Sequence, residues 1–335
     1  MPKFNKVFVP GGAGFVGCLL VPQLLSAGYK VTVFDIMYFG TEGLPDHPNL
    51  ALIKGDIRDT KAYADAVTGH DAVVSLGCIS NDASFELDEE LSTSTNLHAF
   101  EPMVAAAKEA GVRRFIYCSS SSVYGVSDQP NVTEDHPLVP LTLYNEYKGK
   151  CEPILFKYMS DDFECVTLRP ATVCGYSPRT RLDVSVNILT NLAVNNGRIT
   201  VFGGEQMRPN LHIQDMCDLY QLVLELPGEK IQGETFNAGY QNMTINEIAA
   251  TVKRVVAEEF PDKPEIEIVR TPSDDNRSYH INSDKIKDRI GFVPKYSVED
   301  AVRDLCKAFR DSRLPGSLED DIYFNVRRLK RLNAA

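Results

Sequence analysis

The chain has 335 residues, 43% of them hydrophobic and 24% charged, a balance that suits a globular protein of two lobes and excludes a disordered or fibrous chain. Its formal net charge of -11 argues against non-specific binding to DNA, RNA or anionic membrane, because each of these surfaces repels a negative protein. No apolar run reaches the roughly 18 residues of a membrane span and residues 1–5 do not resemble a signal peptide, so we expect a cytoplasmic protein.

Short β-branched runs alternate with amphipathic stretches from residue 6 to about 170, a pattern that indicates a parallel sheet flanked by helices. The expected strands are 6–9, 30–34, 52–54, 71–76, 115–118 and 164–168. Helices are expected at 16–27 and 97–110, each followed by a glycine that can close a helix in the left-handed conformation. These elements predict an α/β fold in which residues 1–170 form a Rossmann-type, doubly wound parallel sheet.

The second half of the chain has a looser rhythm, with an expected helix at 184–195 and a short strand around 200–202. Two later helices begin with capping boxes, Thr244 with Glu247 and Ser297 with Asp300, and should run to about residues 259 and 309. We therefore expect residues 171–335 to form mainly a smaller C-terminal α/β substrate lobe. The chain should return to the first domain around residues 210–240.

A glycine-rich turn follows the first expected strand. Gly11, Gly14 and Gly17 stand where the turn enters a helix, so the backbone can approach a pyrophosphate and the helix N-terminus can bind it. Asp35 ends the second strand about twenty residues later, where a carboxylate accepts hydrogen bonds from the adenosine ribose. Because that carboxylate disfavours a 2'-phosphate and residues 36–43 contain no lysine or arginine, NAD is favoured over NADP.

A second set of residues predicts the chemistry. Tyr144 and Lys148 are four residues apart in a segment that should begin a helix, which places both side chains on one face. A lysine ammonium and the positive nicotinamide both favour a phenolate, and lowering a tyrosine pKa to near neutrality needs about 4 kcal/mol of such help. Ser120 lies in the serine run 119–122 at the carboxyl end of a strand, where open parallel sheets bind ligands.

With these motifs the chain resembles the extended short-chain dehydrogenase/reductases, specifically the nucleotide-sugar epimerase and dehydratase family, from Lys6 to about Phe309. The resemblance makes Ser120 the catalytic hydroxyl, Tyr144 the base and Lys148 its cationic partner. The implied cofactor contacts are Gly11, Gly14, Phe15, Val16, Gly17, Asp35, Asp56, Ile57, Leu76, Gly77, Tyr144, Lys148 and Pro170. The implied substrate contacts are Ser120, Ser122, Tyr144, Thr172, Asn187, Arg208 and Arg277, with Arg270 as the alternative to Arg277.

Departures from the family pattern bear on the reaction. Dehydratases of the family carry an acid beside the catalytic hydroxyl, whereas this chain has Ser121 and Ser122, so elimination of water is disfavoured. Thr172 stands where many relatives have asparagine, and Ser75 replaces a frequent histidine. These two changes leave the cofactor site intact and argue against the usual sugar substrates.

The sequence therefore predicts an NAD-dependent nucleotide-sugar epimerase. Tyr144 is expected to remove the proton of a sugar hydroxyl, with C4 as the expected position, while the hydride passes to NAD and then returns to the other face of the ketone. The alternatives are a C4 dehydrogenase or ketoreductase with the same site, a 4,6-dehydratase, and a non-catalytic NAD-sensing protein.

Two further expectations concern assembly and metals. Relatives pair through helices that here span 97–110 and 147–159, so the resemblance implies a homodimer. The eight cysteines include no CxxC pair and no Cys/His cluster, so we expect neither a metal site nor disulfides. The expected partner is a nucleotide-diphosphate sugar.

Overall fold

The computed structural model describes residues 4–127, 129–273 and 278–333. Its main sheet has seven strands in the order β10-β6-β5-β4-β1-β2-β3, and every neighbouring pair is parallel. The strands are β1 (Lys6–Pro10), β2 (Lys30–Asp35), β3 (Leu50–Lys54), β4 (Ala72–Ser75), β5 (Arg114–Cys118), β6 (Glu164–Pro170) and β10 (Thr235–Ala238). The six expected strands are all present, and the doubly wound fold is confirmed. The strand order reverses between β1 and β4, so a crevice is expected at their carboxyl ends.

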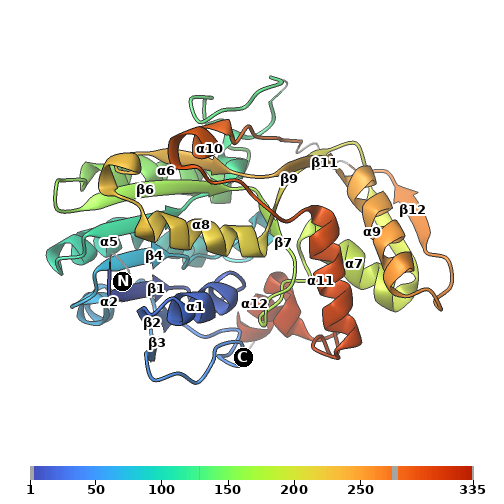
Figure 1. Cartoon of the computed structure of the whole chain (residues 1–335), viewed down its shortest axis with the longest axis horizontal. Helices are drawn as coiled ribbons and strands as arrows, with labels where there is room; N and C mark the ends of the chain where they lie inside the picture. The colour runs from blue at the N-terminus through green and yellow to red at the C-terminus, as the bar shows by residue number, and fades with distance from the viewer. Residues whose placement is uncertain (1–3, 128, 274–277, 334–335) are drawn as a thin grey trace.

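Helices cover both faces of this sheet (Figure 1). On one face lie α1 (Gly17–Ser26) and α8 (Ile213–Glu225), which contact each other. On the other lie α2 (Thr60–Val67), α5 (Phe100–Glu109) and α6 (Leu143–Lys157). Apolar side chains from each layer form a separate core against the sheet, so the strands are buried on both sides.

The expected helix at 97–110 begins later than predicted, at Phe100, because residues Ser94–His98 form a wider π-helical turn. Short helices α3 (Asp82–Phe85) and α4 (Glu89–Thr93) precede this turn. Within it, the Asn96 side chain accepts from the Ile79 N–H and donates to the Ile79 carbonyl, both at 2.8 Å. The turn thereby holds the segment that follows β4.

The second lobe has its own core, formed by α7 (Ser185–Asn196), α9 (Ile245–Glu259) and α11 (Val298–Arg310). A parallel pair, β8 (Arg198–Phe202) and β12 (Glu267–Thr271), packs with them, and α10 (Asp284–Ile290) contacts β10 of the main sheet. A small sheet of β11 (Gln241–Thr244), β9 (Met207–His212) and β7 (Thr172–Cys174) connects the two parts of the chain.

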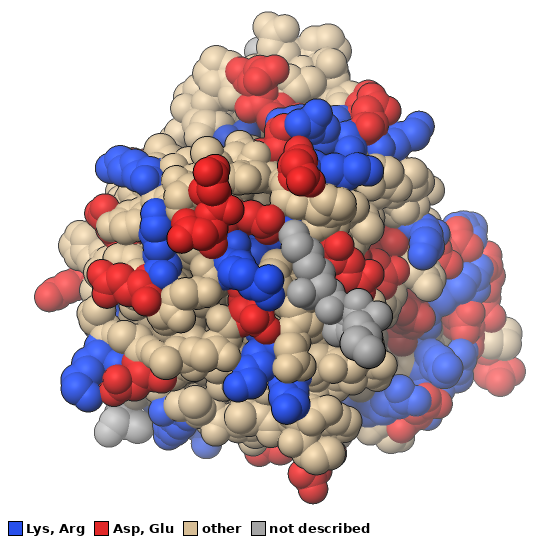
Figure 2. Space-filling model, turned by 60° about the vertical axis from the view of Figure 1, so that its left-hand side comes forward, with Lys and Arg blue, Asp and Glu red and all other residues tan. Residues whose placement is uncertain are grey.

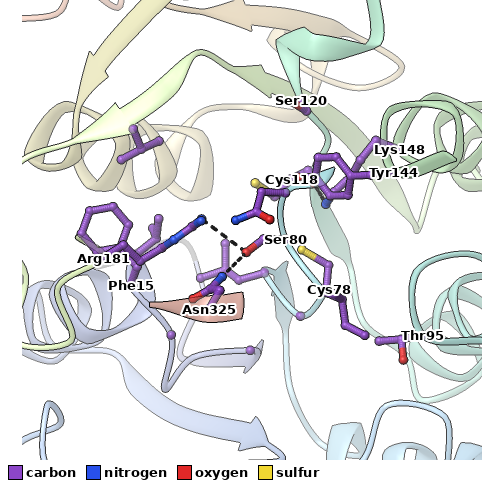
Figure 3. A pocket seen from close by; sticks show the side chains of 18 of the residues that line it. Phe15, Cys78, Ser80, Thr95, Cys118, Ser120, Tyr144, Lys148, Arg181 and Asn325 are labelled. Atoms are coloured by element: carbon purple, nitrogen blue, oxygen red, sulfur yellow. Dashed lines mark hydrogen bonds between the residues drawn. The ribbon is translucent and has the colours of Figure 1, made fainter. Parts of the chain in front are cut away.

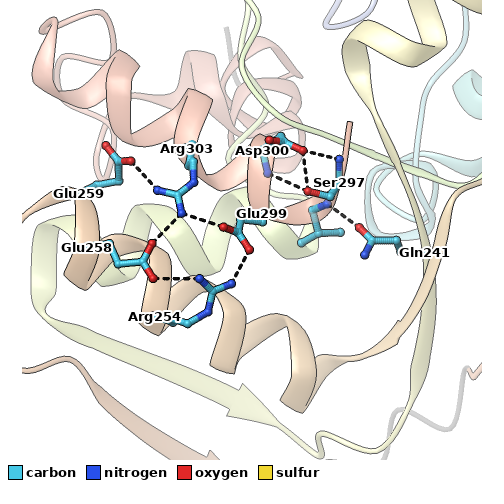
Figure 4. A network of polar contacts seen from close by, with 9 residues as sticks. Gln241, Arg254, Glu258, Glu259, Ser297, Glu299, Asp300 and Arg303 are labelled. Atoms are coloured by element: carbon cyan, nitrogen blue, oxygen red, sulfur yellow. Dashed lines mark hydrogen bonds and ion pairs between the residues drawn. The ribbon is translucent and has the colours of Figure 1, made fainter. Parts of the chain in front are cut away.

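Both predicted capping boxes are confirmed, at the starts of α9 and α11. An ion-pair network also joins these two helices (Figure 4). Arg303 of α11 contacts Glu258 and Glu259 of α9 as well as Glu299 of its own helix, and Arg254 of α9 contacts Glu299. The groups are partly exposed, so the network orients the two helices more than it stabilises them.

The last helix, α12 (Asn325–Asn333), packs on the turn that precedes it and also contacts α3 of the first domain (Figure 1). On the molecular face drawn in Figure 2, basic and acidic side chains are interspersed. No helix in the described part of the chain is both long and apolar enough to cross a bilayer.

Candidate functional site

A cavity of about 740 Å³ opens at the carboxyl ends of β1, β4, β5 and β6, where the order of the sheet reverses. This volume lies within the range of small-molecule and cofactor sites. The second lobe and α12 also contribute to its walls. The cavity therefore joins the residues expected to bind a dinucleotide with those expected to carry the chemistry.

The glycine-rich turn forms one wall. Gly11 has a φ of +78°, and a Cβ there would overlap the backbone of Gly77; a Cβ at Gly17 would overlap the Gly12 backbone. Gly14 also lines the cavity. The turn thus lets the backbone approach a ligand at the N-terminus of α1, where free N–H groups and the helix dipole favour an anion.

Asp35 lies at the end of β2 with one oxygen accepting from the Ala13 N–H at 3.1 Å and the other from the Met37 N–H at 2.7 Å. Burial raises the pKa of its carboxyl, and these two backbone bonds oppose the shift. Each oxygen keeps a lone pair for a ribose hydroxyl. Asp56 lines the cavity as expected, but its carboxylate forms a bidentate ion pair with Arg58, with a closest contact of 2.5 Å.

Helix α6 carries the two residues expected to act on the substrate. Thr142 caps it by accepting from the Asn145 N–H, so Tyr144 lies in the first turn and Lys148 one turn later. Both line the cavity, and Figure 3 shows them side by side near Cys118. The Lys148 ammonium donates to the Cys118 carbonyl at 2.7 Å, which fixes its position at the end of β5.

Burial and nearby positive charge have opposite effects on the pKa of Tyr144. Burial raises the pKa of Tyr144 above its usual value, whereas Lys148, and more weakly Arg181, lower it. Burial also disfavours the Lys148 ammonium, but the surrounding acidic groups, led by Cys78, outweigh it and raise that pKa. In the protein alone the phenol therefore stays protonated beside a charged lysine.

Ser120 caps a short 3₁₀ turn at Ser121–Tyr124. Its hydroxyl contacts the Ser122 hydroxyl at 2.7 Å, and Ser122 donates to Oδ1 of Asn145 at 2.5 Å. Ser120 and Ser122 line the cavity, whereas Ser121 is 1% exposed and lies outside the lining. The serine run thus presents two linked hydroxyls to the cavity from the side of α6.

Most of the remaining predicted residues line the cavity. The cavity lining includes Phe15, Val16, Ile57, Leu76, Gly77, Pro170, Thr172 and Arg208. Arg208 lies over the ring of Tyr279, with its guanidinium carbon 5.6 Å from the ring centre.

Two of the residues that the resemblance assigns to the substrate lie outside the cavity lining. Asn187 is fully buried in α7 and its amide binds the backbone of Gly175 and Arg181, because the loop before the helix needs these bonds. Arg270 lies on β12, where it is exposed and donates to Asn246 at 3.1 Å. Neither residue lines the cavity. Arg277 lies outside the described residues.

Several lining residues were not predicted. Arg179 and Arg181 come from the loop between β7 and α7, and Asn325 comes from α12. The two arginines follow the carboxyl end of a strand, which is a signal that sequence analysis can use. Asn325 lies 142 residues beyond Asp183, its contact in the fold, so no local pattern identifies it.

Comparison with known proteins identifies the family. The model of the NAD dependent epimerase/dehydratase family matches residues 7–239. A low-salt glycan biosynthesis protein, Agl12, of Haloferax volcanii is 29% identical over 303 residues, which are 88% of this chain and 96% of that protein. A UDP-glucose 4-epimerase of Lactobacillus helveticus is 27% identical, with coverage of 89% and 94%.

Among solved structures, MoeE5 in complex with UDP-glucuronic acid and NAD superposes with a TM-score of 0.77 at 25% identity, covering 92% of this chain and all of that one. The family match spans the sheet, the glycine-rich turn and the Tyr144 helix. The chain therefore belongs to the NAD dependent epimerase/dehydratase family, a branch of the extended short-chain dehydrogenase/reductases that acts on nucleotide sugars and uses NAD.

Proposed function

We propose that this chain is a nucleotide-sugar epimerase that oxidises the C4 hydroxyl of its sugar and then reduces the ketone from its other face. One observation carries the proposal: Ser120, Tyr144 and Lys148 line the same cavity as the glycine-rich turn and Asp35. A hydroxyl bound beside Tyr144 would therefore lie next to the cofactor.

The residues fit NAD. The cradle at Gly11 and Gly17 has no room for a Cβ, and Asp35 retains acceptors for the ribose. NAD, when bound, accepts the hydride of the sugar carbon and donates it back. A positive nicotinamide bound beside Tyr144 would add to Lys148 in opposing the effect of burial on the phenol.

The protein's own residues move the proton. The Tyr144 phenolate accepts the proton of the sugar hydroxyl as the C–H bond breaks, and it returns that proton to the new alkoxide after the ketone has turned over. Ser120 donates to the same oxygen and, through Ser122 and Asn145, is held in one orientation. Lys148 keeps its charge throughout, because its pKa is raised and its ammonium donates to the Cys118 carbonyl at 2.7 Å.

The cavity disfavours elimination of water. Among the residues that the structure describes, four carboxylates line the cavity and all are engaged: Asp35 with backbone N–H groups, Asp56 with Arg58, Asp82 with Thr142, and Asp183 with Arg181. The two positions beside Ser120 carry hydroxyls rather than acids. A dehydratase needs a group that removes a carbon-bound proton and protonates the leaving hydroxyl, and this set offers none in position.

The proposal is tested by incubating the purified protein with UDP- and dTDP-linked glucose, N-acetylglucosamine and glucuronic acid, followed by mass spectrometry and proton NMR. An epimerase gives a product of unchanged mass with altered ring couplings, and substrate deuterated at C4 keeps its label. Loss of two hydrogens with accumulation of NADH would instead identify a dehydrogenase. Loss of water, with solvent deuterium in the product, would identify a dehydratase, and either result overturns the proposal.

Assembly stays a prediction. The expected dimer would pair the helices α5 and α6, which contact each other within one chain. Sedimentation of the purified protein would decide between monomer and dimer.

A further inference from the structure

Two arginines line the cavity without a role in the reaction proposed above. Arg179 is 6% exposed and the side chain of Arg181 is 13% exposed. Both belong to the loop that leads from β7 into α7. Figure 3 shows Arg181 beside Phe15 of the glycine-rich turn, with its guanidinium directed toward Ser80. Charged side chains buried to this degree require an anion or an equivalent set of acceptors.

The loop is fastened to the glycine-rich turn. The Ser177 hydroxyl donates to the Phe15 carbonyl at 2.7 Å, across 162 residues of sequence. From inside the second lobe, Asn187 donates to the carbonyls of Gly175 and Arg181 at 3.0 and 2.8 Å. The two arginines are therefore held at a fixed position relative to the N-terminus of α1.

The charge on these arginines is incompletely compensated by the described residues. Arg181 pairs with Asp183 at 2.8 Å, but its Nη2 has no hydrogen-bond partner among them. Arg179 donates to the neutral Oδ1 of Asn325 at 2.6 Å, and its Nε also lacks a described partner. Burial, together with repulsion by Arg181, lowers the pKa of Arg179 to about 9. A bound anion would accept hydrogen bonds from the guanidinium groups, and its negative charge would raise the pKa of Arg179 again.

The site of that anion follows from the geometry. The α1 N-terminus attracts a diphosphate on one side, and the loop fastened to Phe15 faces the cavity from another. Arg179 and Arg181 line the same cavity as Asp35 at its ribose end and Tyr144 at its reactive end, and Arg179 lowers the pKa of Asp35 whereas Arg181 lowers that of Tyr144. In a dinucleotide the diphosphate lies between these two ends.

We infer that Arg179 and Arg181 bind the diphosphate of NAD opposite the glycine-rich turn, and that the C-terminal helix α12 holds both arginines in place through Asn325. Three hydrogen bonds of Asn325 support the role of α12. Its Oδ1 accepts from Arg179, its Nδ2 donates to the Ser80 hydroxyl at 2.9 Å, and its backbone N–H donates to Asp183, the partner of Arg181, at 2.9 Å.

Helix α12 is itself attached to the cofactor domain. Arg328 Nε donates to the carbonyl of Tyr38, just beyond β2, at 2.7 Å, while Val326 and Leu329 line the cavity. The dinucleotide would thus lie against α12, whose contacts with the two arginines should slow its release. Slow release suits an enzyme that regenerates its cofactor in place, but the inference rests only on NAD as the cofactor and holds for any reaction at Tyr144.

The test measures NAD release rather than turnover. Purified protein loaded with NAD is mixed with excess 1,N6-etheno-NAD, and the exchange is followed by fluorescence. Arg179→Met and Arg181→Met should each accelerate release about tenfold or more, because each removes charged hydrogen bonds to the diphosphate. Asn325→Ala should accelerate it severalfold. Arg179→Lys, which keeps the charge without the planar donors, should fall between wild type and Arg179→Met.

Arg331→Met is the matched control, since Arg331 lies on the same helix, is exposed and pairs with Asp321 at 3.2 Å. Its release rate should equal that of wild type. Binding of ADP-ribose, which contains the diphosphate, should weaken in both arginine variants, whereas binding of adenosine should change less than twofold. Unchanged NAD release in both arginine variants, or equal weakening of ADP-ribose and adenosine, overturns the diphosphate site. Unchanged release in Asn325→Ala with faster release in Arg179→Met overturns the role of α12.

Discussion

Tyr144 illustrates how one residue type acquires a function from its surroundings. Its position in the first turn of α6 brings it within reach of Lys148, which is the pairing that the sequence predicts. In the structure, burial opposes the effect of Lys148: it raises the pKa of Tyr144 and keeps the phenol neutral until a second cation binds nearby. Binding of oxidised NAD would supply that cation, so the base would become active only in the loaded enzyme.

Replacing Tyr144 with phenylalanine should lower kcat by about a hundredfold to ten-thousandfold, the usual contribution of a positioned base. NAD binding should persist, because the glycine-rich turn and Asp35 are untouched. The measurement is the initial rate of product formation together with the NAD content of the purified protein. Tyr147→Phe is the control, since Tyr147 lies on the same helix but packs against Phe85, with ring centres 5.6 Å apart, and does not line the cavity. Near-normal turnover in Tyr144→Phe would exclude it as the base.

At the scale of elements, α6 is fixed by a buried network behind the cavity. Glu152, one turn after Lys148, receives two bonds from Arg169 of β6, at 2.9 and 2.6 Å, and one from the Ser119 hydroxyl at 2.6 Å. Arg169 also donates to the Tyr124 hydroxyl at 2.6 Å. Helix α6 is thereby joined to the strands that end at the cavity, so its position relative to the cofactor wall is fixed.

Glu152→Gln should destabilise the protein by about 3–5 kcal/mol, because it leaves the buried guanidinium of Arg169 without its counter-charge. Glu152 and Arg169 are 4% and 5% exposed, so solvent does not compensate the loss. The free energy of unfolding is measured by urea titration. On the same helix, Glu146→Gln removes an exposed pair with Lys150 and should change stability little. Equal effects of the two substitutions would show that the buried pair does not anchor α6.

For the whole molecule, the sequence predicts what depends on local pattern. The six strands, the glycine-rich turn and the Tyr144 helix all follow from periodicity and spacing, and all are present. The seventh strand, β10, has no clear alternation, so the sequence predicts only that the chain returns to the first domain around residues 210–240 and not the strand itself. Asn187 has the residue type expected of a ligand contact, but its side chain donates to the Arg181 carbonyl instead. Asn325 reaches the cavity from α12. These roles depend on tertiary contacts that no local pattern encodes.

The molecule also buries an unusual set of weak acids within its cores. Burial raises the pKa of Cys151, Cys165, Cys174 and Cys306 from 9.0 to about 12, and it raises the pKa of Tyr220 well above its usual value. The folded state therefore binds these protons more tightly than the unfolded state. Their contribution to stability is complete below pH 9.0 and is lost as the pH rises toward about 12.

The free energy of unfolding should accordingly fall with pH above 9.0, the ordinary pKa of these thiols, by about 1.4 kcal/mol per pH unit for each thiol that ionises only on unfolding. Urea titrations across this alkaline range give the slope. Cys174→Ala should lower stability somewhat at neutral pH, because it removes a buried sulfur, yet it should make the alkaline slope shallower by about one thiol's share. A shallower alkaline slope in this variant indicates proton linkage through the Cys174 thiol. General charge repulsion in a chain whose net charge is already -11 would leave the slope almost unchanged. An unchanged slope in Cys174→Ala would show that this thiol ionises in the folded protein, and hence that the core around β7 admits water.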